Sequence, residues 1–128
     1  MLYADMRICA CQHILLAMRE LVRACKAIAA ETRLRILNIL MVKECSVSEV
    51  MQALQLSQTS ASRNLTALYN AGLLNSRRVG PWVLYAVDEQ GLDGHSRELL
   101  SALQGMLSTN RLARQDIVRL DKAKRLDA

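Results

Sequence analysis

Residues 56–87 read LSQTSASRNLTALYNAGLLNSRRVGPWVLYAV, and this stretch decides the fold. A serine that can accept a backbone N–H precedes a run with helical spacing of alanine and leucine, and a glycine that can end a helix follows it. Two short runs of alternating or clustered apolar residues come next, separated by a Gly-Pro turn. The stretch therefore predicts a helix over 58–71 and two strands over 73–79 and 82–87, joined as a β-hairpin.

A second short helix is expected directly before this one. Ser46 and Glu49 have the spacing of a capping box, in which each side chain accepts a hydrogen bond from the backbone N–H of the other residue. A helix should therefore begin at Val47 and end near residues 55–56. Two short helices joined by a tight turn are a helix-turn-helix candidate, and the hairpin that follows would be its wing.

The rest of the chain predicts further helices, because apolar residues recur at three- and four-residue steps. Residues 1–11 are expected to form a short arm or a further turn of the first helix, and residues 110–127 a charged, weakly amphipathic continuation. The predicted fold class is mainly α with a small β-hairpin wing, a winged helix-turn-helix. The other expected helices cover 12–28, 29–42 and 92–107.

The pattern divides the chain into three segments. Residues 1–28 would be an N-terminal arm and dimerisation helix, residues 29–90 the winged helix-turn-helix DNA-binding domain, and residues 91–128 a C-terminal dimerisation helix with a basic tail. The first helix and the helix after the wing carry more apolar surface than one small core needs, which predicts a homodimer. The tail from Arg111 to Arg125 would either add phosphate contacts or solvate the end of the dimer.

Charge indicates a nucleic-acid partner. The formal net charge is +5, and residues 51–87 contain no Asp or Glu. A surface free of carboxylates and tipped with arginines suits a phosphate backbone. The outer face of the helix at 58–71 should carry Gln, Thr, Ser and Arg, which can read base edges in a groove, instead of the Glu and Lys of an ordinary solvated helix. An ordinary helix and hairpin with a basic bias is the alternative.

Other classes of protein have little support. The chain has no Cys-x-x-Cys, no Gly-rich phosphate loop and no carboxylate pair, so we do not expect an enzyme. No apolar run approaches the roughly 20 residues of a membrane span. The N-terminal region contains Asp5 and Arg7 and lacks the apolar region of a signal peptide. We therefore expect a cytoplasmic protein with reduced thiols and no membrane partner.

Three segments in the same order resemble the ArsR/SmtB family of metal- and metalloid-responsive repressors: KAIAAETRLRILNIL at 26–40, LSQTSASRNLTALYNAGLL at 56–74 and RRVGPWVLYAV at 77–87. The resemblance implies a dimeric winged-helix protein that binds double-stranded operator DNA when empty, with no cofactor required, and releases it when an inducer binds. Trp82 and Tyr85 are expected to pack the hairpin against the helices. The family's DNA-reading positions fall on Gln58, Thr59, Ser60, Ser62 and Arg63 in the helix and on Arg77 and Arg78 beside the wing.

The resemblance is weaker at the sensor. Arsenic- and cadmium-responsive members carry a Cys-Val-Cys motif and an acidic residue just before the third helix. Here the position reads Cys45-Ser46-Val47-Ser48-Glu49, with Ser46 and Ser48 in place of thiols. A serine hydroxyl stays protonated and is a poor ligand for a soft centre, whereas a thiolate binds As(III) strongly. A natural shift of the ligand set or a deliberate Cys→Ser replacement would both give this sequence.

The remaining candidate ligands are Cys9, Cys11 and Cys45. Three thiolates would suit As(III), Sb(III) or another soft metal ion as the inducer, and in an extended arm Cys9 and Cys11 would point to one face. The alternative is two free thiols on the arm and a buried Cys45. Cys25 lies on an apolar stripe and is expected in the core.

Asp93 and His95 resemble half of the family's zinc-type site after the wing. The second half should follow about three turns later, where the chain has no matching ligands, so we do not expect that site. The sequence thus predicts a DNA-binding transcriptional repressor released from its operator by a thiophilic metalloid or metal. The alternatives are a repressor that senses redox state through its thiols, and a winged-helix interaction module that does not bind DNA.

Overall fold

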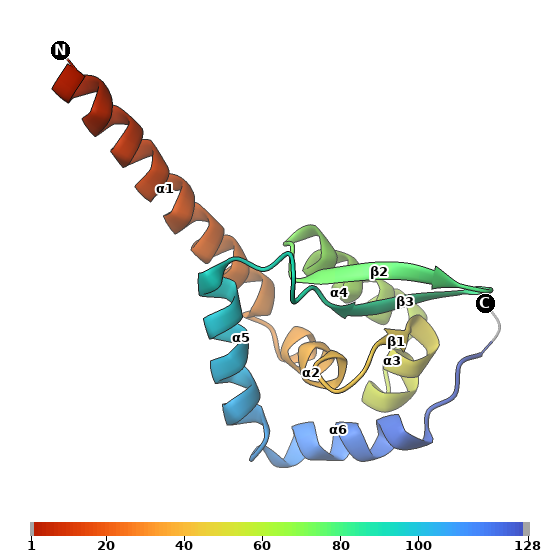
Figure 1. The fold of residues 1–128 in the computed structure, drawn as a ribbon. Coiled ribbons are helices and arrows are strands. Elements are labelled where there is room, and N and C mark those ends of the chain that lie inside the picture. Colours follow the sequence, from red (N-terminus) through yellow and green to blue (C-terminus); the bar gives the residue numbers. More distant parts are fainter. Residues whose placement is uncertain (1, 127–128) are drawn as a thin grey trace.

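The computed structural model describes the backbone of residues 2–126 and the side chains of residues 15–126. This part of the chain is mainly α-helical with a small antiparallel sheet, which confirms the predicted fold class. Helix α1 projects from a body made by all the other elements (Figure 1). In chain order the elements are α1 (Leu2–Ile28), α2 (Glu31–Leu40), β1 (Cys45–Ser46), α3 (Val47–Leu54), α4 (Gln58–Asn70), β2 (Leu74–Val79), β3 (Trp82–Val87), α5 (Gly94–Leu107) and α6 (Arg111–Lys122).

Helix α1 is continuous from Leu2, so residues 2–11 extend the first helix and do not form a separate arm. Near its C-terminal end Ala24, Ala27 and Ile28 are buried against the body. The prediction that Cys25 lies in the core is wrong, because its side chain is exposed. Cys25 follows Ala24 by one residue, and one residue turns a side chain by about 100° around a helix.

Local capping signals define the two helices of the helix-turn-helix. The Ser46 hydroxyl accepts the Glu49 N–H at 3.3 Å, and the Glu49 carboxylate accepts the Ser46 N–H at 3.1 Å, which confirms the capping box. Ser57 caps α4 by accepting the Ser60 N–H at 3.1 Å. Helix α4 ends before Gly72, whose φ of +82° is a left-handed conformation that favours glycine.

The sheet has the strand order β1-β3-β2, with the wing strand β3 in the centre. Strands β2 and β3 form the predicted hairpin. Strand β1 is not among the strands that the sequence predicts, because two residues are too few to show an alternating pattern. Cys45 pairs with Tyr85, and Ser46 pairs with Leu84. The residues just before α3 are therefore part of the same sheet as the wing.

One apolar core joins the body. Side chains from α2, α3, α4 and the wing meet there, and the end of α1, α5 and α6 close over it. None of the helices in residues 2–126 combines the length and apolarity needed to cross a bilayer. The largest fully buried apolar side chains are Ile36, Leu37, Ile39, Leu54, Leu65, Leu68, Leu73, Leu84 and Leu120.

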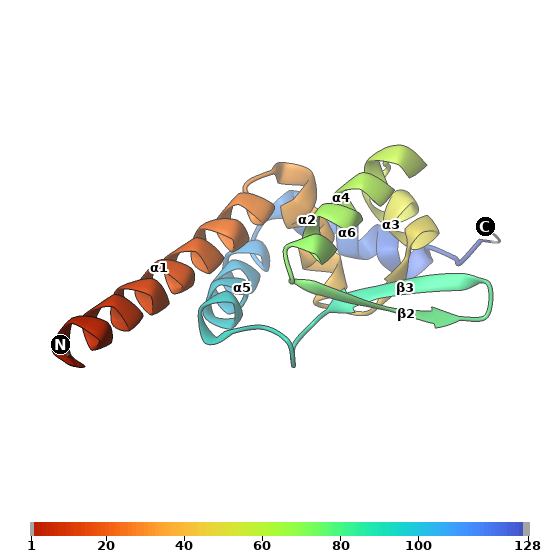
Figure 2. The same ribbon diagram turned by 90° about the horizontal axis from the view of Figure 1, so that it is seen from above.

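Helix α6 lies across α2 and α3 and completes the body (Figures 1 and 2). Its inner face contains Ala113, Asp116 and Leu120, which are all buried. The Asn38 amide donates to the Ala113 carbonyl at 3.0 Å and fixes α6 on α2. The sequence leaves the role of this tail open, and the structure shows that the inner face of α6 is part of the core.

Candidate nucleic-acid interface and sensor region

Helix α4 is held by its inner face and leaves its outer face open. Ala61, Leu65 and Leu68 are buried. The guanidinium of Arg33 donates to the Asn64 side-chain oxygen at 3.3 Å and to the Ala27 carbonyl at 3.3 Å, which ties α4 to the junction of α1 and α2. These contacts hold α4, the candidate DNA-reading helix, on the side away from its open face.

The predicted base-reading residues of α4 do not all point the same way. Gln58, Thr59 and Arg63 are exposed, and Ser62 is half-buried beside them. Ser60 is also half-buried, and its hydroxyl lies 3.4 Å from the side-chain nitrogen of Asn64. Ser60 and Ser62 therefore lie at the edge of the open face, whereas Gln58, Thr59 and Arg63 lie on it.

Arg77 and Arg78 differ in their surroundings. Successive residues of a strand point to opposite faces, so the two side chains diverge from β2. Arg77 forms a two-point ion pair with Glu44, in which Nε lies 2.9 Å from one carboxylate oxygen. The hydrogen bond from Arg77 holds the pKa of Glu44 below its usual range. Arg78 instead borders a groove of about 400 Å³ that it shares with Gln58.

Cys45 is buried in the sheet. Its side chain has no exposed surface, and its Sγ donates to the Lys43 carbonyl at 3.5 Å. Burial raises the pKa of the Cys45 thiol to about 12, and the nearby Glu49 carboxylate also raises it. At neutral pH the group is a protonated thiol, which is not the form that binds soft metals.

The two serines at the sensor position bond to each other, with 2.9 Å between their hydroxyl oxygens. Ser46 also caps α3, and the Ser48 hydroxyl accepts the backbone N–H of Leu126 at 3.1 Å. Both hydroxyls therefore serve the structure around the start of α3.

Glu49 carries the negative charge of this region and is almost fully buried. Its carboxylate pairs with Lys43 at 3.2 Å and with Arg125 at 2.9 Å. Burial alone would raise the pKa of Glu49, but the Ser46 N–H and the two cations outweigh burial and lower it. Glu49 therefore stays ionised at neutral pH and anchors the segment that contains Arg125.

The described residues do not by themselves make a metalloid site. Among side chains 15–126 no three His, Cys, Asp or Glu groups gather as metal ligands. Cys45 supplies one buried thiol, and the side chains of Cys9 and Cys11 lie outside the described residues. Asp93 is the N-cap of α5 and accepts the Ser96 N–H at 2.7 Å, so its role is structural.

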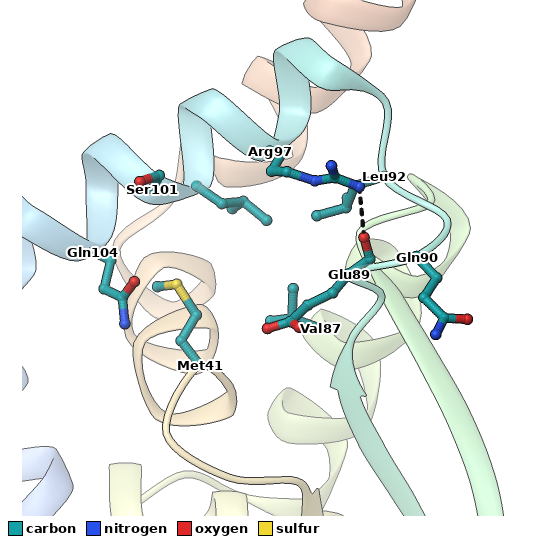
Figure 3. Close-up of a pocket in the computed structure, with 9 residues that line it drawn as sticks. Met41, Val87, Glu89, Gln90, Leu92, Arg97, Ser101 and Gln104 are labelled. Carbon is teal, nitrogen blue, oxygen red and sulfur yellow. Dashed lines mark hydrogen bonds between the residues drawn. The ribbon is translucent and has the colours of Figure 1, made fainter.

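A separate hollow of about 460 Å³ lies between the end of α2, the end of β3 and α5 (Figure 3). Met41, Val87, Leu92 and Leu100 give it an apolar lining. At its rim the Arg97 guanidinium donates to the Glu89 carbonyl at 2.9 Å. No buried side-chain N or O among the described residues lacks a hydrogen-bond partner, so no such group marks this hollow as a ligand site.

The C-terminal segment is the main contribution that sequence reasoning missed. The indole N–H of Trp82 donates to the Leu126 carbonyl at 3.0 Å, a contact that the sequence does not indicate. Tyr85 does pack against the core, as expected. Residues 123–126 follow α6 without regular structure, and no periodic pattern in the sequence indicates where they dock.

A helix-turn-helix with an exposed second helix, followed by a β-hairpin, defines a winged helix-turn-helix transcriptional regulator. Residues 30–76 match the family model described as "Bacterial regulatory protein, arsR family". The arsenic resistance transcriptional regulator ArsR1 of Pseudomonas putida is 38% identical over 91 residues, which span 68% of this chain and 71% of that protein. The chain belongs to the ArsR family.

Two further relatives support this assignment. The transcriptional activator HlyU of Vibrio cholerae is 42% identical over 62 residues, which span 48% of this chain and 57% of that protein. The homodimeric winged helix-turn-helix DNA-binding domain of Mb0332 from Mycobacterium bovis superposes with a TM-score of 0.62 at 28% identity, covering 76% of this chain and 86% of that domain. The relatives are transcriptional regulators, and the prediction of the family is confirmed.

Proposed function

We propose that the chain is a homodimeric repressor that binds double-stranded operator DNA through α4 and the wing. The observation that carries this proposal is the open face of α4, where Gln58, Thr59 and Arg63 are exposed within a stretch that contains no carboxylate. The other proposed contacts are made by Ser60 and Ser62 at the edge of this face and by Arg77 and Arg78 on the wing.

The two wing arginines have different roles in this proposal. The Arg78 side chain is exposed and borders the groove beside Gln58, where phosphate can reach it. Arg77 must leave Glu44, or share it, before it can contact phosphate. We therefore expect Arg63 and Arg78 to contribute more to DNA affinity than Arg77.

Operator binding tests the proposal. Sites are selected from a random duplex library with the full chain, and binding to the selected site is measured by fluorescence anisotropy across a range of salt concentrations. Arg63→Ala and Arg78→Ala should each weaken binding by about 1–3 kcal/mol, and loss of a phosphate contact should reduce the salt slope by about one. Arg111→Ala removes an exposed charge on α6 and is the matched control.

Two results would contradict this proposal. The first is equal affinity for the selected site and for random DNA, which would favour an interaction module. The second is activation, instead of repression, of a reporter promoter that carries the selected site, because the relative HlyU is named as an activator.

We further propose that a thiophilic metalloid such as As(III) or Sb(III), or a soft metal ion, releases the DNA. Two relatives named as arsenic resistance regulators support this choice of inducer. The candidate ligands are Cys9, Cys11 and Cys45. Because Cys45 is buried and pairs with Tyr85 of β3, any reaction of its thiol must disturb the sheet that contains the wing.

Titration of the reduced protein with As(III) tests the inducer separately. We expect a thiolate–arsenic absorption band together with release of the selected DNA, and both should be lost when Cys9, Cys11 or Cys45 is replaced by serine. Cys25→Ser is the control, because Cys25 is not in the proposed ligand set. Release by a mild oxidant but not by As(III) would favour redox sensing and leave the DNA-binding proposal intact.

A further inference from the structure

The segment after α6 is docked on α3. The Gln52 side chain makes two hydrogen bonds to the backbone of Lys124, donating to its carbonyl at 2.6 Å and accepting its N–H at 3.0 Å. The Leu126 N–H donates to the Ser48 hydroxyl at 3.1 Å. We call residues 123–126 the strap, because they run from the end of α6 past α3 to Trp82 of the hairpin.

The strap also holds the wing near its tip. Trp82 pairs with Val79 on either side of the Gly80-Pro81 turn, so it lies at the far end of the hairpin. Its indole N–H donates to the Leu126 carbonyl at 3.0 Å, and the Arg125 guanidinium lies 5.9 Å from the centre of its ring. Such a contact between a cation and an aromatic ring is attractive.

Arg125 connects the wing to a buried charge. Its Nε lies 2.9 Å from a carboxylate oxygen of Glu49, which is almost fully buried in the first turn of α3. Lys43 is the second cation on Glu49. Because Arg125 pairs with a buried carboxylate, phosphate would have to compete with Glu49 for its guanidinium.

We propose that Arg125 and Trp82 are positioning residues for DNA binding, which act by fixing the tip of the wing to the start of α3 through the strap. This inference rests on the proposed function. Within residues 2–126, β1 supports β3 only at Leu84 and Tyr85, and no further strand lies beside the outer half of the hairpin. An isolated two-stranded hairpin is marginally stable in water, and holding it in place before DNA binds reduces the cost of ordering it.

The groove beside the strap supports the same inference about the wing. Leu126 and Trp82 line it together with Gln58, the first residue of α4, and Arg78 of the wing. The strap therefore borders the same groove as both proposed DNA-reading elements. A change in the strap should alter how α4 and the wing are placed relative to each other, without removing any side chain proposed to contact DNA.

Trp82 is the single tryptophan of the chain, so its fluorescence reports directly on the strap. In Arg125→Ala the fluorescence emission maximum of Trp82 should shift to longer wavelength, and acrylamide should quench the fluorescence more strongly. Affinity for the selected operator should fall at least about fivefold, the lower end of typical coupling between sites. The slope of log affinity against log salt should stay unchanged, because no phosphate contact is lost.

Matched variants separate positioning from charge. Lys124→Ala removes the same charge one residue away and keeps the two backbone hydrogen bonds to Gln52, so emission and affinity should stay as in the wild type. Arg125→Lys retains a cation near Glu49 and should recover part of the lost affinity. Circular dichroism of each variant checks that it is folded.

Three results would overturn the inference. The first is unchanged emission in Arg125→Ala, and the second is wild-type operator affinity in that variant. The third is a salt slope reduced by about one, which would make Arg125 a direct phosphate contact. Failure of the proposed function is distinguishable, because it appears in the wild type as a lack of operator preference, whereas these results appear only in the variant.

Discussion

Asp116 shows how one charged residue can determine the placement of a whole helix. Its carboxylate is fully buried and accepts two hydrogen bonds of 2.8 Å from Arg35 and one of 2.6 Å from Arg119. The hydrogen bond to Asp116 is the main cause of the raised pKa of Arg35. A buried charge is costly unless it is paired, so α6 can dock on α2 only in a position that brings Asp116 to Arg35.

Replacing this carboxylate should therefore destabilise the fold. In Asp116→Asn the shape is retained but Arg35 and Arg119 lose their anion, and we expect the free energy of unfolding to fall by about 3 kcal/mol. Urea denaturation followed by circular dichroism measures the loss. Asp121→Asn, an exposed carboxylate on the same helix, should change stability by less than about 0.5 kcal/mol. Equal stability of the two variants would mean that the buried pair does not hold α6.

At the scale of single elements, two glycines should respond oppositely to alanine. At Gly72 a methyl group would meet no atom within 4 Å, but φ is +82°, so Gly72→Ala should destabilise the end of α4 by about 1 kcal/mol. At Gly105 in α5 the space is also open, and the backbone is helical. Gly105→Ala should therefore stabilise the protein by about 0.5–1 kcal/mol.

Thermal unfolding of both glycine variants and the wild type measures the difference. Because neither methyl group meets a neighbour, any effect comes from the backbone and not from packing. A loss of stability at Gly105 as large as that at Gly72 would contradict the assignment of the left-handed stop to Gly72.

Elements with local signals could be predicted from the sequence, and elements defined by distant partners could not. Helices α3 and α4 carry their own caps at Ser46 and Ser57, and the hairpin carries its own turn, so their bounds follow from neighbouring residues. Strand β1 has only two residues and exists because Tyr85 and Leu84 lie beside it. The role of Asp116 on the inner face of α6 has no local signal, because this residue looks solvated until Arg35, 81 positions earlier, is placed next to it.

The same distinction applies to the candidate site. An exposed polar face on α4 follows from helical spacing. Ala61, Leu65 and Leu68 recur at three- and four-residue steps and mark the buried side of the helix. The pairing of Arg77 with Glu44 and the docking of Leu126 on Trp82 join residues 33 and 44 positions apart, and no local pattern encodes them.

For the whole molecule, the exposed apolar face of α1 is the surface to examine for the proposed dimer. Leu15, Leu16, Met18 and Val22 are between 42% and 56% exposed in the single chain. Helix α5 offers less apolar surface than expected, because Leu100 is buried in its own core and Leu99 and Leu103 pack against that core. The dimer contact should therefore depend mainly on α1.

Charges on this face should separate the subunits. We expect Met18→Glu combined with Val22→Glu to give a monomer in light scattering at micromolar concentration, because two carboxylates would be buried without partners at the contact. Operator affinity should fall with it, since two half-sites can no longer be bound together. Val118→Glu, an equally exposed apolar residue on α6, is the control and should remain dimeric. A dimer that survives both substitutions on α1 would place the contact elsewhere.

The position of α6 also has a consequence for protein synthesis. The helix-turn-helix is complete in sequence at residue 70, yet the buried partner of Arg35 in α2 and the cover over α3 come from residues 111–122. A ribosome adds about 5–20 residues per second, and a domain gains its stability only when its long-range contacts can form. We therefore expect a nascent chain that has emerged only as far as the wing to lack the packing that covers α2 and α3, until residues 111–122 have also emerged.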